Sequence, residues 1–420
     1  MDVLILERSG PLQGTVEASG AKNAALPIMA ACLLTDEESV IDGVPNVTDV
    51  VTMTKILRTL GAEVLHEGDR LVIHPGCDNG WTAPYELVSL MRASICVLGP
   101  LLARHGRARV SLPGGCVIGR RPVDLHLKGL TALGAEIAID HGDIVAQAEQ
   151  MTGTAIHLAG AFGSSVLATD NVMMAATLAD GVTVIEQAAC EPEVVDVAEC
   201  LIGMGARITG HGTPKIRIEG VQRLHGVRHR IISDRIETGT LMIAAAMVGG
   251  DVTVRRANPD HLGALMTKLR EAGVKVDSVP DGLRTRSSRG LKAVEVTTLP
   301  FPGFPTDLQA QFTALMAISH GVSLVIEKIY PERFMHVAEL QRMGAVITRE
   351  GPSAIIKGVE RLGGAPVKAS DLRGAAALVL AGLAADNHTV LHGVEHLDRG
   401  YEGFEEKLTR LGAKIHRQEE

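Results

Sequence analysis

Residues 111–127, SLPGGCVIGRRPVDLHL, place a cysteine and two adjacent arginines on one short stretch that contains two prolines. Cys116 follows a Gly-Gly pair, and Arg120 and Arg121 come shortly after it. Neighbouring guanidinium groups lower the pKa of a thiol, and the thiolate is its reactive form. These residue types favour a reactive thiol beside an anion-binding site over the simpler alternative of a polar surface loop.

Cationic residues recur at the expected starts of apolar helices, where the positive end of the helix dipole disfavours them. These residues are Lys22, Arg92, Arg235 and Arg373. A second set of helices is expected to begin near Arg120, Arg121, Arg333 and Arg399. Ion pairs with neighbouring acids are the structural alternative, and the acids that invite it are Asp234, Asp371 and Asp398. As a set in register, the cations indicate binding of phosphate or carboxylate groups.

Asp307 is an acid at a helix start where other parts of the chain carry a base. It follows the stretch FPGFPT, which is rich in proline and aromatic residues for this sequence and indicates a shaped loop. A carboxylate there could cap the helix by accepting backbone N–H groups. The functional alternative is a general base, or an acceptor for a substrate hydroxyl.

An internal repeat predicts how these residues are positioned. The phrase LRTLGAEV recurs five more times, with its glycine at intervals of 68 to 73 residues. The glycines are Gly61, Gly134, Gly205, Gly273, Gly344 and Gly412. Each phrase is typical of a helix end, a glycine C-cap and a following strand. An apolar helix rich in small residues precedes each phrase, so the chain is predicted to contain six βαβαββ-like units of an α/β (α+β) fold.

The sixth unit is truncated, because only HRQEE follows its last helix and first strand residues. The N-terminal stretch LILERSGPLQGTVEAS resembles the end of the fifth unit in pattern, so residues 1–21 are expected to complete the last repeat. This predicts two domains of three repeats each. One is continuous, residues 22–231, and the other combines residues 1–21 with residues 232–420.

Composition excludes several classes of function. The net charge of −8 and an aromatic content of 2% argue against nucleic-acid binding, which needs a clustered basic face and rings for stacking. The longest apolar run, Ala375–Ala385, is too short for a bilayer, and the start lacks a signal-peptide pattern. Six cysteines without a CxxC pair indicate neither a zinc site nor a disulfide framework. We therefore expect a cytoplasmic protein with no membrane segment, no metal and no cofactor.

Eight motifs together resemble the enolpyruvyl transferases over essentially the whole chain. They are SGAKNAALP, MRAS, PGGCVIGRRPVDLH, EPEVVD, DRIETGT, FPTDLQAQF, RFMHVAEL and LDRGYEG. The resemblance implies a two-domain inside-out α/β barrel, three repeats per domain. It also implies transfer of the enolpyruvyl group from phosphoenolpyruvate to the 3′-hydroxyl of UDP-N-acetylglucosamine, the first committed step of peptidoglycan synthesis. Phosphate would be released through a tetrahedral intermediate without metal or redox cofactor.

The same resemblance implies roles for individual residues. Cys116 would protonate C3 of phosphoenolpyruvate or form an adduct with it, and Asp307 would take the proton of the attacking hydroxyl. The phosphate and carboxylate would be held by Lys22, Arg121 and Arg399, with Arg92, Arg333 and Arg373 nearby. Asn23 would contact the sugar or the intermediate. The uridine or diphosphate would be lined by Asp124, Ser165 and Val166.

The sequence also departs from the family at three positions. The family pattern has an aromatic residue where Cys96 stands, a glycine near Leu167 and an arginine near Cys190. The Cys96 change is interpreted as repacking of the core, Leu167 borders the expected nucleotide loop, and Cys190 bears on a regulatory or product contact. Related transferases that act on 3-phosphoshikimate lack the loop cysteine. A catalytically silent paralogue is disfavoured because Cys116, Asp307, Lys22 and Arg399 are all present. The oligomeric state is left open.

We predict that Cys116→Ala abolishes or cripples turnover, because it removes the thiol that the resemblance implies as proton donor or nucleophile. Cys116→Asp is expected to keep activity, since a carboxyl group can also transfer a proton. The aspartate variant should escape alkylation by fosfomycin, which should block the unmodified protein at Cys116. Phosphate release with and without fosfomycin measures both effects, and wild-type turnover by the alanine variant would disprove the role of the thiol.

Overall fold

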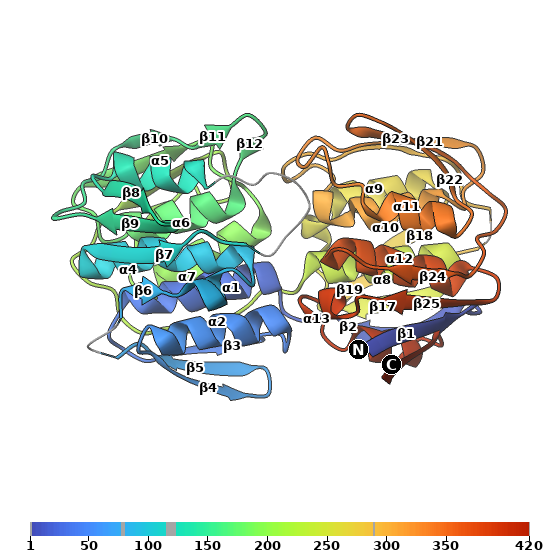
Figure 1. The fold of residues 1–420 in the computed structure, drawn as a ribbon, viewed down its shortest axis with the longest axis horizontal. Coiled ribbons are helices and arrows are strands. Elements are labelled where there is room, and N and C mark those ends of the chain that lie inside the picture. The colour runs from blue at the N-terminus through green and yellow to red at the C-terminus, as the bar shows by residue number, and fades with distance from the viewer. Residues whose placement is uncertain (1, 77–79, 115–122, 289, 420) are drawn as a thin grey trace. The chain divides into compact units, whose positions relative to one another are not determined.

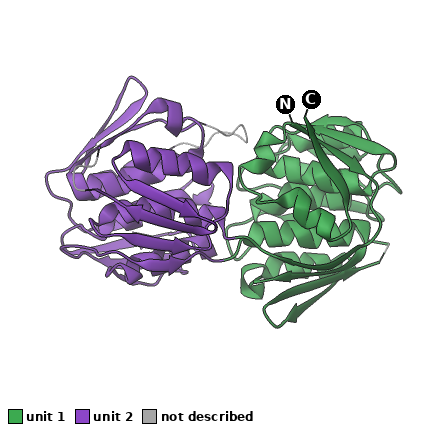
Figure 2. Ribbon diagram, turned by 90° about the horizontal axis from the view of Figure 1, so that it is seen from below, with its two compact units in different colours: residues 1–19, 117–119, 233–420 green, residues 20–116, 120–232 purple. Residues whose placement is uncertain are grey.

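The structure is a computed structural model that describes residues 2–76, 80–114, 123–288 and 290–419. The described residues form two compact units, shown in separate colours in Figure 2. Unit 1 contains residues 2–19 and the described residues from 233 to 419, and unit 2 contains the described residues from 20 to 232. The sequence-based domain boundaries fall after residues 21 and 231.

Six four-stranded sheets of one topology build the described part of the chain, three in each unit (Figure 1). In unit 2 the first sheet contains, in spatial order, β16 (Arg228–Arg230), β3 (Ser39–Asp42), β5 (Arg70–His74) and β4 (Glu63–Glu67). The second contains β6 (Thr82–Ala83), β7 (Arg107–Ser111), β9 (Asp143–Gln147) and β8 (Glu136–Asp140). The third contains β10 (Ala155–His157), β13 (Val182–Glu186), β15 (Lys215–Glu219) and β14 (Arg207–Thr209). A two-stranded hairpin, β11 (Ala159–Gly160) and β12 (Gly163–Ser164), lies between β10 and β13 in the sequence of this unit.

The sheets of unit 1 follow the same order. They are β2 (Leu12–Glu17), β17 (Gly250–Arg255), β19 (Gly282–Ser287) and β18 (Lys275–Val279); β20 (Glu295–Thr297), β21 (Val322–Ile326), β23 (Ser353–Lys357) and β22 (Val346–Glu350); and β24 (Pro366–Lys368), β25 (His388–His392), β1 (Asp2–Glu7) and β26 (Lys414–Glu419). In every sheet the first two strands are parallel and the other two pairings are antiparallel. The predicted βαβαββ repeat is confirmed.

Strands from elsewhere in the chain complete three of the sheets. β1 pairs with β25 and β26 in the sixth sheet. The expectation that all of the N-terminal strands complete the last repeat is wrong for β2, which pairs in parallel with β17 of the fourth repeat. The first repeat is completed by β16, from the end of unit 2, which pairs in parallel with β3. Each unit is therefore closed by strands distant in sequence.

Three apolar helical segments pack against one another inside each unit, and the sheets lie around them. In unit 2 these segments are α1 (Lys22–Ala31), η2 (Arg92–Val97) with α4 (Leu98–His105), and α6 (Val166–Ala176). In unit 1 they are α8 (Arg235–Val248), α10 (Gln309–Met316) and α12 (Leu372–Ala384). We call these the inner helices. Nearly all of their residues are buried, because alanine, glycine and leucine let the helices approach closely. This arrangement confirms the two-domain inside-out α/β fold.

A second set of helices packs beside the inner ones. In unit 2 they are α2 (Thr48–Thr59), α5 (Asp124–Ala132) and α7 (Pro192–Gly203); in unit 1 they are α9 (Gly263–Glu271), α11 (His336–Arg342), α13 (Glu395–Asp398) and α14 (Phe404–Arg410). Short helical segments are η1 (Cys32–Leu34), α3 (Tyr85–Val88), η3 (Pro259–His261) and η4 (Thr306–Leu308).

The six recurring glycines follow six of these helices, all except α13, as the repeat predicts. Their φ angles lie between 91° and 102°, in the left-handed region that only glycine adopts without strain. A backbone hydrogen bond of 3.0 Å from Gly61 N to Arg58 O illustrates the closing turn, and equivalent bonds recur at Gly273 and Gly412. The glycines therefore set the sharp change from helix to strand in each repeat.

The longest apolar run of the sequence lies in α12, where it is enclosed by the core of unit 1. Across the described ranges, no helix is both long and apolar enough to span a bilayer. Apolar runs in this chain thus build the interior of the units.

Within the described ranges, the chain passes between the units after residue 19 and after residue 232, and each of these places directly precedes an inner helix. Within unit 1, the backbone N–H of Asp234 donates to the carbonyl of Ser19 at 2.8 Å. Within unit 2, the N–H of Ala21 donates to the carbonyl of Ile232 at 2.7 Å. Lys22 and Arg235 begin α1 and α8 immediately after these bonds. The crossings therefore fix where two inner helices start.

We predict that Gly358→Ala destabilises unit 1 by at least about 2 kcal/mol, because the backbone would have to shift to admit a side chain. A Cβ at Gly358 would lie 1.6 Å from the carbonyl oxygen of Ser319. Gly263→Ala is the matched control, since a Cβ there meets nothing within 4 Å. Urea unfolding of both variants measures the difference, and equal midpoints would contradict the prediction.

Candidate active site

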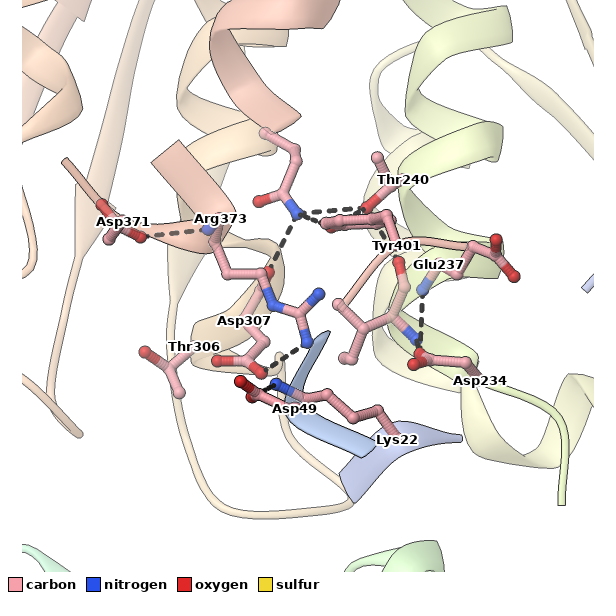
Figure 3. A network of polar contacts seen from close by, with 12 residues as sticks. Lys22, Asp49, Asp234, Glu237, Thr240, Thr306, Asp307, Asp371, Arg373 and Tyr401 are labelled. Atoms are coloured by element: carbon pink, nitrogen blue, oxygen red, sulfur yellow. Dashed lines mark hydrogen bonds and ion pairs between the residues drawn. The ribbon is translucent and has the colours of Figure 1, made fainter. Parts of the chain in front are cut away.

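Asp307 lies between two guanidinium groups in unit 1 (Figure 3 shows Asp307 with Arg373). Arg333 Nη1 donates to Asp307 Oδ1 at 2.6 Å, and Arg373 Nη2 donates to Oδ2 at 3.0 Å. Asp307 sits in η4, Arg333 precedes α11, and Arg373 is in the first turn of α12. Three residues from different parts of the sequence thus form one ionic cluster.

The charges of this cluster keep Asp307 ionised. Burial alone would raise the pKa of Asp307, but the positive charges and hydrogen bonds of Arg373 and Arg333 outweigh burial and hold that pKa well below its usual range. The side chain of Asp307 is 26% exposed, whereas those of Arg333 and Arg373 are 6% and 3% exposed. The carboxylate contacts guanidinium groups and makes no capping bond to the following helix. The capping alternative does not apply.

Both arginines retain buried donors. Among the residues that the structure describes, Arg333 Nε and Arg373 Nη1 have no hydrogen-bond partner. Burial removes the hydrogen bonds of a donor to water, and without a protein partner nothing compensates for that loss. Two such donors beside one carboxylate form a place where an anion could bind, and anion binding by Arg333 and Arg373 stays a prediction.

A tyrosine that sequence reasoning did not single out joins this cluster to the inner helices. The Tyr401 hydroxyl lies 3.0 Å from Thr240 Oγ1 and 3.1 Å from Gln311 Nε2. Its ring lies under the Arg373 guanidinium, with 5.2 Å between Cζ and the ring centroid. The signal in the sequence was the rarity of tyrosine, of which the chain has three, within the motif LDRGYEG.

Two of the acids suggested as ion-pair partners act as helix caps. Asp234 Oδ1 accepts from the backbone N–H groups of Ile236 and Glu237, and Asp371 Oδ1 accepts from those of Arg373 and Gly374. The acid that contacts the Arg373 guanidinium is Asp307. Asp398 contacts Arg417 at 2.6 Å. Arg399, the C-cap of α13, is half-buried.

Lys22 is the first residue of α1 in unit 2, and its charge is paired within that unit. Its Nζ donates to Asp49 Oδ2 of α2 at 2.8 Å, and both residues are buried. This carboxylate offsets the unfavourable position of a cation at a helix start. Asn23 is the next residue of α1 and is half-buried. The sequence did not indicate Asp49 as the partner of Lys22, because acidic residues are common in the first turn of helices and carry no specific signal.

The other predicted residues of unit 2 also lie at helix starts. Arg92 begins η2, Asp124 begins α5 and is exposed, and Val166 begins α6. Ser165 is the N-cap of α6, where its Oγ accepts from the N–H of Ala168 at 3.4 Å. Cys116, Arg120 and Arg121 lie outside the described residues. Within the described ranges, no group of three or more His, Cys, Asp or Glu residues could hold a metal ion.

The structure places the three residues that were expected to depart from the family pattern. Cys96 is fully buried in the core of unit 2, and Leu167 is half-buried in the first turn of α6. Cys190 Sγ lies 3.7 Å from the carbonyl of Ala188, just before α7. Burial raises the pKa of the Cys190 thiol, and the charge of Glu191 adds to this effect. None of the three adds a charge to the site residues.

The fold and the residue pattern match one family of known proteins. The family described as EPSP synthase (3-phosphoshikimate 1-carboxyvinyltransferase) matches residues 6–408. The chain belongs to this family of enolpyruvyl transferases, which confirms the resemblance. A solved structure titled as the enolpyruvyl transferase NikO from Streptomyces tendae has a TM-score of 0.88 at 24% identity and covers 99% of this chain and 98% of that one. An EPSP synthase structure from Acinetobacter baumannii has a TM-score of 0.75 at 18% identity over the full length of both chains.

Curated relatives with a narrower name match over nearly the whole length. A protein of Methylacidiphilum infernorum named UDP-N-acetylglucosamine 1-carboxyvinyltransferase is 53% identical over 417 residues, 99% of each chain. A protein of the same name from Myxococcus xanthus is 52% identical over 421 positions, covering both chains completely. A Caldanaerobacter subterraneus protein, UDP-N-acetylglucosamine 1-carboxyvinyltransferase 1, is 52% identical over 98% of this chain and 99% of its own length.

His126 of α5 provides a test of electrostatics beside the predicted nucleotide residues. It is buried, and its Nδ1 lies 3.0 Å from Asn171 Nδ2. Burial, with the charge of Arg92, lowers the pKa of His126 to about 3. The unfolded chain binds this proton near pH 6.5, so the free energy of unfolding should fall by up to about 1.4 kcal/mol per pH unit from pH 6.5 toward pH 3 because of this group.

We predict that His126→Gln reduces the loss of stability between pH 6.5 and pH 3, because the variant has no imidazole to protonate on unfolding. His141→Gln is the control, since the His141 side chain is 94% exposed. Urea unfolding near pH 7 and near pH 5 measures the slope for each protein. Equal slopes for His126→Gln and the unmodified chain would show that the pKa of His126 is not depressed.

Proposed function

We propose that this protein transfers the enolpyruvyl group of phosphoenolpyruvate to the 3′-hydroxyl of UDP-N-acetylglucosamine and releases phosphate. The observation that carries the proposal is the Arg333–Asp307–Arg373 cluster, which combines an ionised acid with two unfilled guanidinium donors. Support for the acceptor comes from the relatives named UDP-N-acetylglucosamine 1-carboxyvinyltransferase, which are 52–53% identical over nearly full length.

Phosphoenolpyruvate presents a phosphate and a carboxylate, and both need cations. Arg373 and Arg333 have donors available for one of these anions. The other cations proposed to bind phosphoenolpyruvate are Lys22, Arg92, Arg121 and Arg399. Guanidinium groups suit this task because they pair with carboxylate and phosphate oxygens in a fixed planar geometry. The same charges would stabilise the phosphate as it leaves.

Asp307 is proposed to accept the proton of the attacking 3′-hydroxyl. A carboxylate held by two guanidinium groups is a weak base, because their charges lower its proton affinity. An anion that binds the free donors of Arg333 and Arg373 would partly neutralise these charges. The pKa of Asp307 would then rise when phosphoenolpyruvate is bound, so Asp307 would become a stronger base only when that substrate occupies the site.

Addition and elimination then follow with balanced proton transfers. The 3′-oxygen forms a bond to C2 of phosphoenolpyruvate as its proton passes to Asp307, and C3 receives a proton from Cys116. If Cys116 instead adds to C2, its sulfur forms the bond to C2 and its proton passes to C3; the 3′-oxygen later displaces the thiolate from C2 as its own proton passes to Asp307. In the second half, C3 returns a proton to the Cys116 thiolate, the C2–O bond to phosphate breaks, and the enol ether forms as phosphate leaves.

The nucleotide sugar is proposed to bind in unit 2, at the starts of its helices. Asn23 would contact the sugar or the intermediate, and Asp124 the uridine or diphosphate region. Ser165 and Val166 would contribute the beginning of α6, where backbone N–H groups and the helix dipole favour the negative charge of the diphosphate. Leu167 borders this region, so its departure from the family pattern affects the backbone contacts there.

The proposal extends to the place of the reaction in the cell. The enolpyruvyl ether of UDP-N-acetylglucosamine belongs to peptidoglycan synthesis, and hence to cell-wall formation, cell shape and division. Both substrates carry several negative charges, which a bilayer excludes, so we place the reaction in the cytoplasm. A reactive Cys116 would also make the protein a target of the epoxide fosfomycin.

We predict that the purified protein releases phosphate from phosphoenolpyruvate when UDP-N-acetylglucosamine is present, and not when shikimate 3-phosphate replaces it. Phosphate release from phosphoenolpyruvate with shikimate 3-phosphate, and not with UDP-N-acetylglucosamine, would assign the chain to the related transferases that act on 3-phosphoshikimate. Binding of UDP-N-acetylglucosamine without any turnover would favour a silent paralogue. In the productive assay, Asp307→Asn should lower kcat at least about 100-fold, because it removes the general base.

Asp251→Asn is the matched control for the loss of a carboxylate paired with arginine. Asp251 contacts Arg284 through two hydrogen bonds of 2.5 and 2.7 Å, but both side chains are more than 40% exposed. Its kcat should stay within twofold of the unmodified enzyme. Equal effects of the two substitutions would contradict a specific role for Asp307.

A further inference from the structure

We propose that Tyr401 is a positioning residue that holds Arg373 through its ring and the Asp307 turn through its hydroxyl. The inference deepens the proposed function, because it concerns how the acid and one of its arginines are kept in place. Tyr401 is 3% exposed and follows α13 in unit 1, where Figure 3 shows it beside Thr240 and Arg373.

The hydroxyl of Tyr401 connects two inner helices. It lies 3.0 Å from Thr240 Oγ1 of α8 and 3.1 Å from Gln311 Nε2 of α10. Gln311 Nε2 also lies 3.1 Å from Thr240 Oγ1, so the three polar groups form a closed set. All three residues are buried, and a buried polar set of this kind stabilises one arrangement of the helices that carry it.

Gln311 extends this set to the backbone of Asp307. Its Nε2 donates to the carbonyl oxygen of Asp307 at 3.0 Å. Asp307 is one turn before Gln311, at the point where η4 passes into α10. The amide of Gln311 therefore contacts Tyr401 on one side and the Asp307 turn on the other, and the hydroxyl of Tyr401 sets where that amide lies.

The ring of Tyr401 acts on the other side of the same cluster. The Arg373 guanidinium lies 5.2 Å above the ring centroid, within the range of a cation–π contact. The same guanidinium donates to Asp307 Oδ2 at 3.0 Å. Tyr401 thus reaches Asp307 by two routes, through Gln311 to its backbone and through Arg373 to its carboxylate.

Tyr401 also anchors the segment that carries Arg399. Its backbone N–H donates to the carbonyl of Leu397 at 3.1 Å, which closes the turn around Arg399. Phe404 is the first residue of α14, and the centroid of its ring lies 4.7 Å from that of the Tyr401 ring. Arg399, proposed above to bind phosphoenolpyruvate, therefore lies on a turn that Tyr401 connects to the inner helices α8 and α10.

A role in packing alone does not account for this arrangement. Phenylalanine would fill the same volume without a buried hydroxyl, and burying a hydroxyl is unfavourable unless it is hydrogen-bonded. Here the hydroxyl contacts residues of two separate helices, and the ring faces a charged group. The combination points to control of the position of Asp307 and Arg373.

The test is Tyr401→Phe, which keeps the ring over Arg373 and removes the hydroxyl. Loss of this hydroxyl should lower kcat about tenfold, the effect of one misplaced hydrogen bond. The KM for UDP-N-acetylglucosamine should stay within twofold, because its proposed contacts lie in unit 2. Tyr85→Phe is the matched control, since Tyr85 is 65% exposed, and it should behave as the unmodified enzyme.

Gln311→Met provides an independent variant of the same link and keeps the length of the side chain. It should lower kcat to a similar degree, and the double variant Tyr401→Phe/Gln311→Met should lose no more than about threefold beyond either single variant. A thermal unfolding scan establishes that each protein is folded under assay conditions. If Tyr401→Phe fails to fold, Gln311→Met alone tests the link by the same split between kcat and KM.

A kcat within twofold of the unmodified enzyme in a folded variant would overturn the inference. Independent, multiplicative losses in the double variant would also overturn it, because they would mean that Tyr401 and Gln311 do not act through one contact. Failure of the proposed function is distinguishable, since the unmodified protein would then release no phosphate with UDP-N-acetylglucosamine and phosphoenolpyruvate.

Discussion

Enclosure of three helices at the centre of each unit is the constraint on which the structure depends. The inner helices pack against one another and are covered by sheets, so almost none of their surface reaches water. A charged side chain at such a helix start must find a partner, because an unpaired buried charge is strongly unfavourable. Lys22 and Asp49, and Asp307 with Arg333 and Arg373, satisfy this requirement within their own units. The packing scheme and the site chemistry are therefore consequences of one arrangement.

The sequence predicted the repeat and the residue types of the site better than it predicted the contacts. The recurring glycines were assigned correctly because a left-handed helix end leaves a local signature. The pairing of β2 with β17 was missed, because a strand pattern specifies which face is buried but not which strand lies beside it. Closure of the first sheet by β16 has the same origin, since it joins residues almost 190 positions apart.

The candidate site shows the same limit at the level of side chains. Arg333, Arg373 and Asp307 were each recognised from the sequence by their places at helix starts. That Asp307 pairs with both arginines follows only from the fold. Neighbouring acids were natural guesses for ion pairs, yet Asp371 bonds to backbone N–H groups instead. Tyr401 had no periodic signal, because its partners Thr240 and Gln311 come from two other repeats. Long-range contacts of this kind are set by how the inner helices assemble.

The strand pairing also bears on the order in which the protein can fold during its synthesis. Unit 2 lies within residues 20–232 and takes all twelve strands of its four-stranded sheets from that range, so it can fold once that segment has left the ribosome. β1 pairs with β26 in a register that joins Asp2 to Glu419, so the sixth sheet is complete only when β26 has also emerged. β1 therefore precedes the other described strands in the chain but is among the last to find its partners. Until then the backbone donors and acceptors of β1 remain open to other strands, which makes β1 a segment that can aggregate during synthesis.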